Sequence, residues 1–202
     1  MPDAIVYIHG RSGSPEEAAH YRGLFPDCAV IGMDYTAQSP WEAAEEFPRW
    51  WQVNCQGCHA VAVIANSIGA YYAMMGLSEQ PIEKAFFISP VADMEKLITD
   101  AMRQSGVTEA ELRAKREITV VTNGRSETLS WEYLCYVREH PVTWNIPTHI
   151  LYGGRDTLTS QETMSAFAAK IGATLTVMEQ GEHWFHTDEQ MAFLDRWITS
   201  LF

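Results

Sequence analysis

Three side chains that can combine in nucleophilic catalysis occur in the order serine, aspartate, histidine, each close to a glycine. Ser67 lies in Ala65-Asn66-Ser67-Ile68-Gly69, Asp156 follows Gly153-Gly154-Arg155, and His183 follows Gly181-Glu182. A serine hydroxyl is a poor nucleophile until an imidazole takes its proton, and a buried carboxylate fixes the tautomer of that imidazole. These residue types predict a nucleophile at Ser67, a general base at His183 and an orienting acid at Asp156.

The segment around Ser67 resembles a nucleophile elbow, a sharp turn from a strand into a helix that holds a serine hydroxyl clear of a sheet. Small residues must flank the serine so that strand and helix can approach closely. The usual pattern is Gly-x-Ser-x-Gly, and here Ala65 replaces the first glycine. A tight turn without catalytic function has the same short pattern, so the prediction depends on the elements around it.

Acyl transfer also needs donors for the oxyanion of a tetrahedral intermediate, and losing one donor typically costs on the order of 3 kcal/mol of transition-state stabilisation. Two backbone amides are expected to supply these donors. One belongs to Ile68, directly after the serine. The other belongs to the loop His9-Gly10-Arg11-Ser12 after the first strand, at Arg11. The His9 side chain fits a loop-organising hydrogen bond better than a catalytic role.

Six short apolar runs, most of them rich in Val, Ile or Phe, predict buried strands. They are Ile5–Ile8, Ala29–Met33, Ala60–Ala65, Ala85–Ser89, His149–Tyr152 and Leu175–Met178. Helix starts, each a hydroxyl residue followed three places on by Glu or Gln, are predicted at Ser14, Ser39, Thr159 and Thr187. This alternation predicts an α/β fold, with a mostly parallel six-stranded sheet and helices on both faces. Ligands bind outside the carboxyl ends of such strands, where the serine, aspartate and histidine stand.

The alternation breaks between the fourth and fifth strands. We expect a single domain over residues 1–202 in which residues 91–147 form a cap-like insertion. Within it, Asp93–Gln104, Thr108–Lys115 and Trp131–His140 have helical character, and Asn123-Gly124 predicts a tight hairpin turn inside Ile118–Leu129. Aromatic residues there could line an apolar substrate pocket, although packing explains the same spacing: Trp131, Tyr133, Tyr136 and Trp144.

Two residues compete for the assigned roles. His186 lies three residues after His183, but its place beside Thr187, a predicted helix cap, indicates a surface position. Asp93 follows the fourth strand and is the rival acid, although Met94-Glu95-Lys96-Leu97 after it makes it resemble a helix cap. Asp156 is preferred, and its own non-catalytic interpretation is a capping or turn aspartate.

Two motifs point toward cofactors but lack essential parts. Gly10-Arg11-Ser12-Gly13-Ser14 could cradle a phosphate of a nucleotide or flavin, yet it has neither the dinucleotide-binding glycine pattern nor a Gly-Lys-Ser/Thr ending. Cys55-Gln56-Gly57-Cys58-His59 matches a covalent haem attachment pattern, which requires export, and zinc would need a further ligand nearby. We therefore expect no cofactor and no metal.

Composition limits the partners. The chain has 202 residues, 47% of them hydrophobic, and a formal net charge of −12, which would repel nucleic acids and anionic membrane surfaces. The apolar stretch Ala60 to Leu77 is better explained as a strand followed by a helix than as a membrane span. The start Met1-Pro2-Asp3-Ala4 lacks export-signal features, so we expect a cytoplasmic protein. Its oligomeric state, monomer or homodimer, stays open.

The motifs in order resemble those of the α/β-hydrolase family: Ile8-His9-Gly10, Asn66-Ser67-Ile68-Gly69, Gly154-Arg155-Asp156 and Gly181-Glu182-His183. The resemblance covers essentially the whole chain and is greatest to small bacterial single-domain members. It implies a serine hydrolase that acts on small esters or related acyl compounds, a carboxylesterase-like enzyme without a cofactor. A protein that keeps this fold only to bind or sense a small molecule is the alternative.

Overall fold

The computed structural model describes residues 2–122 and 125–202, and the chain divides into two compact units. One unit comprises Met1–Ala92 and Thr143–Phe202, and the other comprises Asp93–Val142. The second unit falls within the range 91–147 that the sequence marks as an insertion. Its function as a cap stays a prediction.

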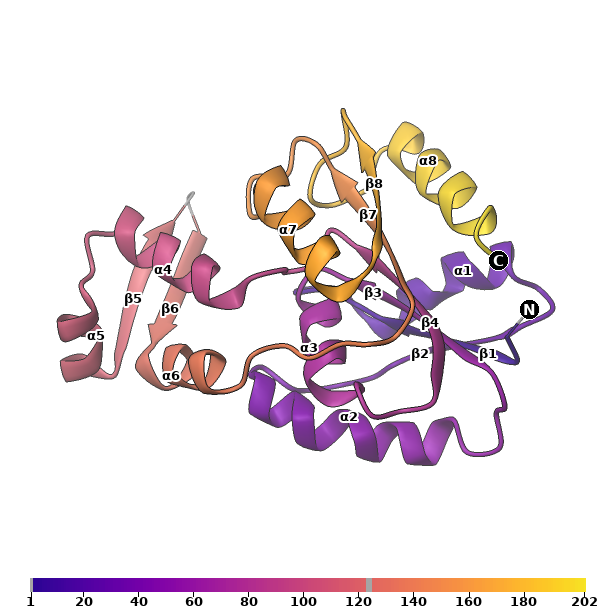
Figure 1. The fold of residues 1–202 in the computed structure, drawn as a ribbon, viewed down its shortest axis with the longest axis horizontal. Coiled ribbons are helices and arrows are strands. Elements are labelled where there is room, and N and C mark those ends of the chain that lie inside the picture. Colours follow the sequence, from indigo (N-terminus) through magenta and orange to yellow (C-terminus); the bar gives the residue numbers. More distant parts are fainter. Residues whose placement is uncertain (1, 123–124) are drawn as a thin grey trace. The chain divides into compact units, whose positions relative to one another are not determined.

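The first unit is built on a six-stranded sheet in which every pairing is parallel (Figure 1). The strand order is β2-β1-β3-β4-β7-β8. The strands are β1 (Ala4–Ile8), β2 (Ala29–Gly32), β3 (Val61–Asn66), β4 (Ile82–Ile88), β7 (Thr148–Gly153) and β8 (Thr174–Met178). All six apolar runs therefore form strands, which confirms the predicted α/β fold class and parallel sheet.

Helices cover both faces of this sheet (Figure 1). They are α1 (Ala18–Leu24), α2 (Pro40–Asn54), α3 (Ile68–Gly76), α7 (Gln161–Ile171) and α8 (Asp188–Thr199), with a short 3-10 turn η1 (Pro15–Glu17) before α1. On one face, Tyr21 of α1 and Trp197 of α8 pack with Ile64 and Phe86 of the central strands in one buried cluster. The apolar strands are thus buried against helices, as parallel strands require.

Three of the four predicted helix caps are where the sequence places them. Ser39 accepts a hydrogen bond from the Glu42 amide, and Thr187 accepts one from the Gln190 amide. Ser14 is the N-cap residue of η1, with Pro15 directly after it, but its side chain makes no capping hydrogen bond. The fourth prediction, at Thr159, is wrong.

The helix predicted to start at Thr159 starts one residue later. Ser160 is the N-cap and accepts from the Thr163 amide. The reason lies in the loop before it. Thr159 is buried, and its carbonyl accepts a hydrogen bond from the Tyr152 hydroxyl at 2.7 Å.

The second unit contains three helices and a two-stranded antiparallel sheet among its described residues. They are α4 (Met94–Gln104), α5 (Glu109–Lys115), β5 (Glu117–Thr122), β6 (Arg125–Ser130) and α6 (Trp131–Glu139). Arg138 of α6 joins the helices, since its guanidinium bonds Glu95 of α4 and Glu109 of α5. The predicted turn at Asn123-Gly124 lies outside the described residues.

The aromatic residues of the expected pocket do not share one environment. Trp144 belongs to the first unit, where it is buried against Phe87 and donates from its indole nitrogen to Thr148 Oγ1. It is therefore a packing residue. Trp131, Tyr133 and Tyr136 belong to α6 of the second unit, and their place in a substrate pocket stays a prediction.

Within residues 2–122 and 125–202, we find no helix with both the length and the apolar character to cross a membrane. The stretch from Ala60 to Leu77 instead forms β3 and α3, which confirms its interpretation as a strand followed by a helix.

Candidate active site

The candidate site forms where the order of the strands reverses. From β1 the chain goes outward to β2, and then returns to β3 on the other side of β1. Loops that leave β1 and β3 therefore diverge at the carboxyl edge of the sheet, and open parallel sheets bind ligands at such a point. The loop after β1 carries Arg11, and the turn after β3 carries Ser67.

Ser67 occupies a strained turn between β3 and α3. Its φ of 50° and ψ of −120° lie in a region that glycine adopts freely and other residues avoid. Its amide donates to the Ile88 carbonyl at 3.0 Å, and its carbonyl accepts from the Ala70 and Val91 amides, both at 3.2 Å. These bonds engage both the amide and the carbonyl of Ser67 and hold its backbone in this conformation. The turn has the geometry of a nucleophile elbow.

Gly69 shows why the elbow needs small residues. A Cβ on Gly69 would lie 2.1 Å from the carbonyl oxygen of His9, and a Cβ on Gly10 would lie 3.3 Å from the Cβ of Ser67. The loop after β1 therefore lies against the start of α3. Ala65, which replaces the first glycine of the usual pattern, is fully buried in β3 and accommodated there.

The structure brings Ser67, His183 and Asp156 together in one hydrogen-bonded line. The hydroxyl of Ser67 lies 2.8 Å from His183 Nε2, and His183 Nδ1 lies 2.7 Å from Asp156 Oδ2. The His183 side chain is 21% exposed and the Asp156 side chain 0% exposed. The other oxygen, Oδ1, accepts from the Leu158 amide at 2.7 Å and the Thr159 amide at 3.3 Å. The carboxylate is thus fully buried but well provided with donors.

The loops that carry Asp156 and His183 are held together by backbone contacts. The Arg155 amide donates to the Gly181 carbonyl at 2.8 Å, and a Cβ on Gly153 would lie 2.4 Å from the Glu182 carbonyl oxygen. Glycine is therefore required where β7 ends. Beyond His183, the buried ring of Phe185 anchors the loop in the core. The spacing of acid and base is fixed by the main chain as well as by their own hydrogen bond.

The loop expected to supply the second oxyanion donor is ordered by its neighbours. The Tyr35 hydroxyl donates to the His9 carbonyl at 2.9 Å, and the His9 ring stacks on the Tyr35 ring with centroids 4.3 Å apart. The His9 Nδ1 lies 2.9 Å from the Gly10 carbonyl, so His9 organises the loop as expected. Arg11 follows Gly10, which lies beside Ser67. The Ile68 amide belongs to the first turn of α3, where helix amides have no partner within the helix.

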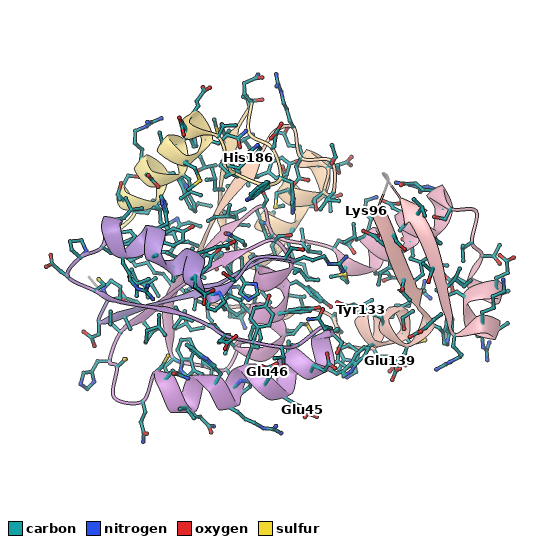
Figure 2. The ribbon with its side chains drawn as sticks, turned by 180° about the vertical axis from the view of Figure 1, so that it is seen from behind. Glu45, Glu46, Lys96, Tyr133, Glu139 and His186 are labelled. Carbon is teal, nitrogen blue, oxygen red and sulfur yellow. The ribbon has the colours of Figure 1, made fainter. Side chains whose placement is uncertain are left out.

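The two rival residues are engaged elsewhere. His186 stands on the loop before α8 (Figure 2), where its ring stacks on Trp184 and its Nδ1 lies 2.7 Å from the Trp184 carbonyl. Asp93 is the N-cap of α4, and its Oδ1 accepts from the Lys96 amide at 2.8 Å. Both residues therefore have the structural positions that the sequence favours for them.

Comparison with solved structures identifies the fold. The chain superimposes on alpha/beta hydrolase domain-containing protein 10 from mouse with a TM-score of 0.74 and 15% identity, over 98% of this chain and 88% of the other. Est1E from Butyrivibrio proteoclasticus has the same TM-score and identity, over 98% and 86%. The chain has the α/β-hydrolase fold. Also similar is the esterase domain of a Rhodothermus marinus protein, with a TM-score of 0.69 and 13% identity over 98% and 85%.

Sequence comparison adds nothing to this likeness. No protein-family model matches the chain, and no curated protein matches it. One structure of Est1E contains bound ferulic acid, and it aligns with this chain at a TM-score of 0.73 and 15% identity, over 98% and 87%.

Several side chains near the candidate site make contacts that the sequence analysis did not predict. Asn66 Nδ2 donates to the Tyr7 hydroxyl at 2.8 Å, and Tyr7 donates to Glu17 Oε2 at 2.5 Å. The buried Asn66 Oδ1 has no hydrogen-bond partner among the described residues, a condition that typically costs about 1–3 kcal/mol. Tyr7 itself was a usable signal, because a hydroxyl in a buried apolar strand needs a partner.

Exposed apolar side chains also lie in the loops that carry Asp156 and His183. Trp184, next to His183, is 71% exposed, and Leu158, two residues after Asp156, is also exposed. Isolated exposed apolar residues are common, but each of these two lies within two residues of a member of the Ser67, His183 and Asp156 line in sequence.

Among residues 2–122 and 125–202, no group of three or more His, Cys, Asp or Glu side chains is arranged to hold a metal ion. Cys55 is buried at the end of α2, and burial raises the pKa of its thiol to about 11. The haem-like motif is therefore a helix end followed by a turn, since the Cys58 amide donates to the Cys55 carbonyl.

Proposed function

We propose that the chain is a serine hydrolase that cleaves a carboxylic ester or a related acyl compound through an acyl-enzyme intermediate. The observation that carries the proposal is the continuous line of hydrogen bonds from Ser67 through His183 to Asp156, at 2.8 and 2.7 Å. These are the residue types and contacts needed to activate a hydroxyl near neutral pH.

In the first step, Ser67 Oγ forms a bond to the acyl carbon, while the carbonyl π electrons move to its oxygen and the hydroxyl proton passes to His183 Nε2. Asp156 accepts from Nδ1 and stabilises the imidazolium. Collapse of the tetrahedral intermediate expels the alcohol, which takes the proton from Nε2. A water oxygen then bonds to the acyl carbon while His183 Nε2 takes a proton from the water. Collapse of this second tetrahedral intermediate breaks the bond to Ser67 Oγ, which takes the proton back from Nε2, and the carboxylic acid is released.

The oxyanion would accept hydrogen bonds from the amides of Ile68 and Arg11. Two observations support this assignment. Ile68 stands at the first position of α3, directly after the nucleophile, and Gly10, the neighbour of Arg11, lies beside the Cβ of Ser67. Donors fixed before the reaction stabilise developing charge without reorganisation, which is commonly the largest catalytic contribution.

The same site and the structural likeness support a proposed substrate class. A small acyl ester fits the activated hydroxyl, and the exposed Trp184 supports an apolar or aromatic group beside it. The similar structures include esterases, and Est1E with ferulic acid supports including a feruloyl ester among the test compounds. Nucleic acid is not proposed as a partner, given the net charge of −12.

Labelling with a fluorophosphonate probe tests the proposal directly. We expect the native protein to be labelled once, with the adduct on Ser67 by peptide mass spectrometry, and Ser67→Ala to lose labelling. A matched control is Ser12→Ala, on the neighbouring loop, which should remain labelled. A folded wild type that stays unlabelled would instead favour a non-catalytic binding protein. Labelling that persists in Ser67→Ala would show that the nucleophile is another residue.

A further inference from the structure

A chain of three side chains connects the elbow to the loop beside it. It starts at Asn66, the residue before Ser67, passes through Tyr7 of β1 and ends at Glu17 of η1. The two hydrogen bonds run in one direction, from the Asn66 amide to the Tyr7 hydroxyl and from that hydroxyl to the Glu17 carboxylate. Residues far apart in sequence are thereby joined at the carboxyl edge of the sheet.

The Glu17 end of this chain supports the loop with the second proposed oxyanion donor. A Cβ on Gly13 would lie 3.0 Å from both carboxylate oxygens of Glu17, so the carboxylate packs directly against Gly13. The Gly13 amide donates to the Gly10 carbonyl at 3.1 Å, which closes residues 10–13 into one turn. Arg11 lies inside that turn. Glu17 therefore contacts the turn that carries Arg11.

The Tyr7 hydroxyl is buried and can keep its hydrogen bond to Glu17 over a wide pH range. Its side chain is 1% exposed, and its ring packs against that of Tyr21 with centroids 5.2 Å apart. Burial above all, with Tyr21 and Glu17 adding to it, raises the pKa of the Tyr7 hydroxyl far above its ordinary value. The hydroxyl stays protonated across the working pH range and can donate to Glu17 throughout.

We propose that Tyr7 is a positioning residue for acyl transfer: through Asn66 and Glu17 it fixes the separation of the Ile68 and Arg11 amides. This inference rests on the proposed function. Oxyanion donors must reach 2.7–3.1 Å from an oxygen whose charge develops only in the transition state, and a misplacement of about 1 Å can cost 100-fold in rate. Loss of Tyr7 should therefore slow acylation and leave the binding of ground-state substrate nearly unchanged.

Pre-steady-state release of p-nitrophenol from p-nitrophenyl acetate separates these two quantities. Tyr7→Phe is expected to lower the acylation rate constant about tenfold and leave substrate dissociation within about twofold. The inhibition constant of phenylboronic acid, whose tetrahedral adduct on Ser67 places an oxygen in the oxyanion site, should rise by the same factor. The matched control is Tyr21→Phe, which removes a hydroxyl from the ring packed on Tyr7 and should change neither quantity.

Glu17 keeps the test decisive if Tyr7→Phe folds poorly. Glu17 is exposed, so Glu17→Ala should fold, and it should lower the acylation rate and boronic acid affinity in parallel. Glu17→Gln keeps an acceptor for Tyr7 and should recover most of that loss. Equal losses in Tyr21→Phe, or variants that change only the melting temperature or substrate dissociation, would overturn the inference. A wild type without fluorophosphonate labelling would overturn the proposed function and this inference with it.

Discussion

Replacing Asp156 with asparagine is the most specific test of the proposed acid, because the structure dictates how the new side chain must sit. Asp156 Oδ1 accepts from the Leu158 and Thr159 amides, and Oδ2 accepts from His183 Nδ1. An asparagine oxygen can satisfy either the two amides or the imidazole. Facing the two amides keeps two hydrogen bonds, whereas the opposite orientation sets an NH2 group against two N–H donors.

Each lost hydrogen bond of this kind costs about 1 kcal/mol, and leaving a buried donor unpaired costs about 1–3 kcal/mol. The amide-facing orientation should therefore dominate, with the asparagine NH2 pointing at His183. The imidazole then accepts at Nδ1 and carries its proton on Nε2, where it cannot take the proton of Ser67. A wrong tautomer of this kind lowers kcat by roughly 10,000-fold, or about 5 kcal/mol of activation free energy.

The assay is steady-state hydrolysis of p-nitrophenyl acetate by Asp156→Asn, with Asp93→Asn as the matched control. Asparagine caps helices as well as aspartate does, so the control should keep wild-type kcat/KM and an unfolding free energy within about 0.5 kcal/mol. Asp156→Asn should remain folded by circular dichroism. The reasoning is refuted if Asp156→Asn keeps more than about a tenth of wild-type kcat/KM, or if the control loses more activity.

Three further outcomes are expected. Trp184→Ala should raise the KM for aromatic esters severalfold relative to the KM for aliphatic acetates, because it removes an exposed ring next to His183 in the sequence. The control is Val53→Ala, which changes a similarly exposed apolar residue on α2 and should leave both KM values unchanged. Gly69→Ala should lower the denaturation midpoint and abolish fluorophosphonate labelling, since its Cβ meets backbone at 2.1 Å. Gly23→Ala, in an open helical position, should instead stabilise the protein by up to about 1 kcal/mol in chemical denaturation. Finally, the pKa of about 11 leaves the Cys55 thiol protonated at pH 8, so iodoacetamide should modify Cys55 only after the protein unfolds. Peptide mass spectrometry measures this modification, and rapid alkylation of the native protein would contradict the burial of Cys55.

Much of the fold and the three central residues can be predicted from local sequence. Apolar runs rich in Val, Ile or Phe identify the strands, because a buried parallel strand must be apolar. Gly153 and Gly181 follow two of these runs, and in the structure each lies against the backbone of the other loop. Once the strands are identified, the sequence also shows that Ser67, Asp156 and His183 follow three different strands.

What could not be predicted depends on contacts between distant segments. The sequence indicates that the buried Tyr7 hydroxyl needs a partner but not which residues supply it, since Asn66 reaches it only once β1 and β3 pair and Glu17 only once η1 packs beside β1. The start of α7 moves from Thr159 to Ser160 for a similar reason, because the Tyr152 hydroxyl holds the Thr159 carbonyl. Such tertiary hydrogen bonds override local preference.

The backbone conformation of Ser67 has a consequence for evolution. At φ 50° and ψ −120°, glycine would relieve strain that any residue with a Cβ must bear, so Ser67→Gly should give a more stable protein than Ser67→Ala. Selection for stability alone would favour glycine at this position. A serine there, with its hydroxyl on His183, is what selection for chemistry would preserve at the expense of stability.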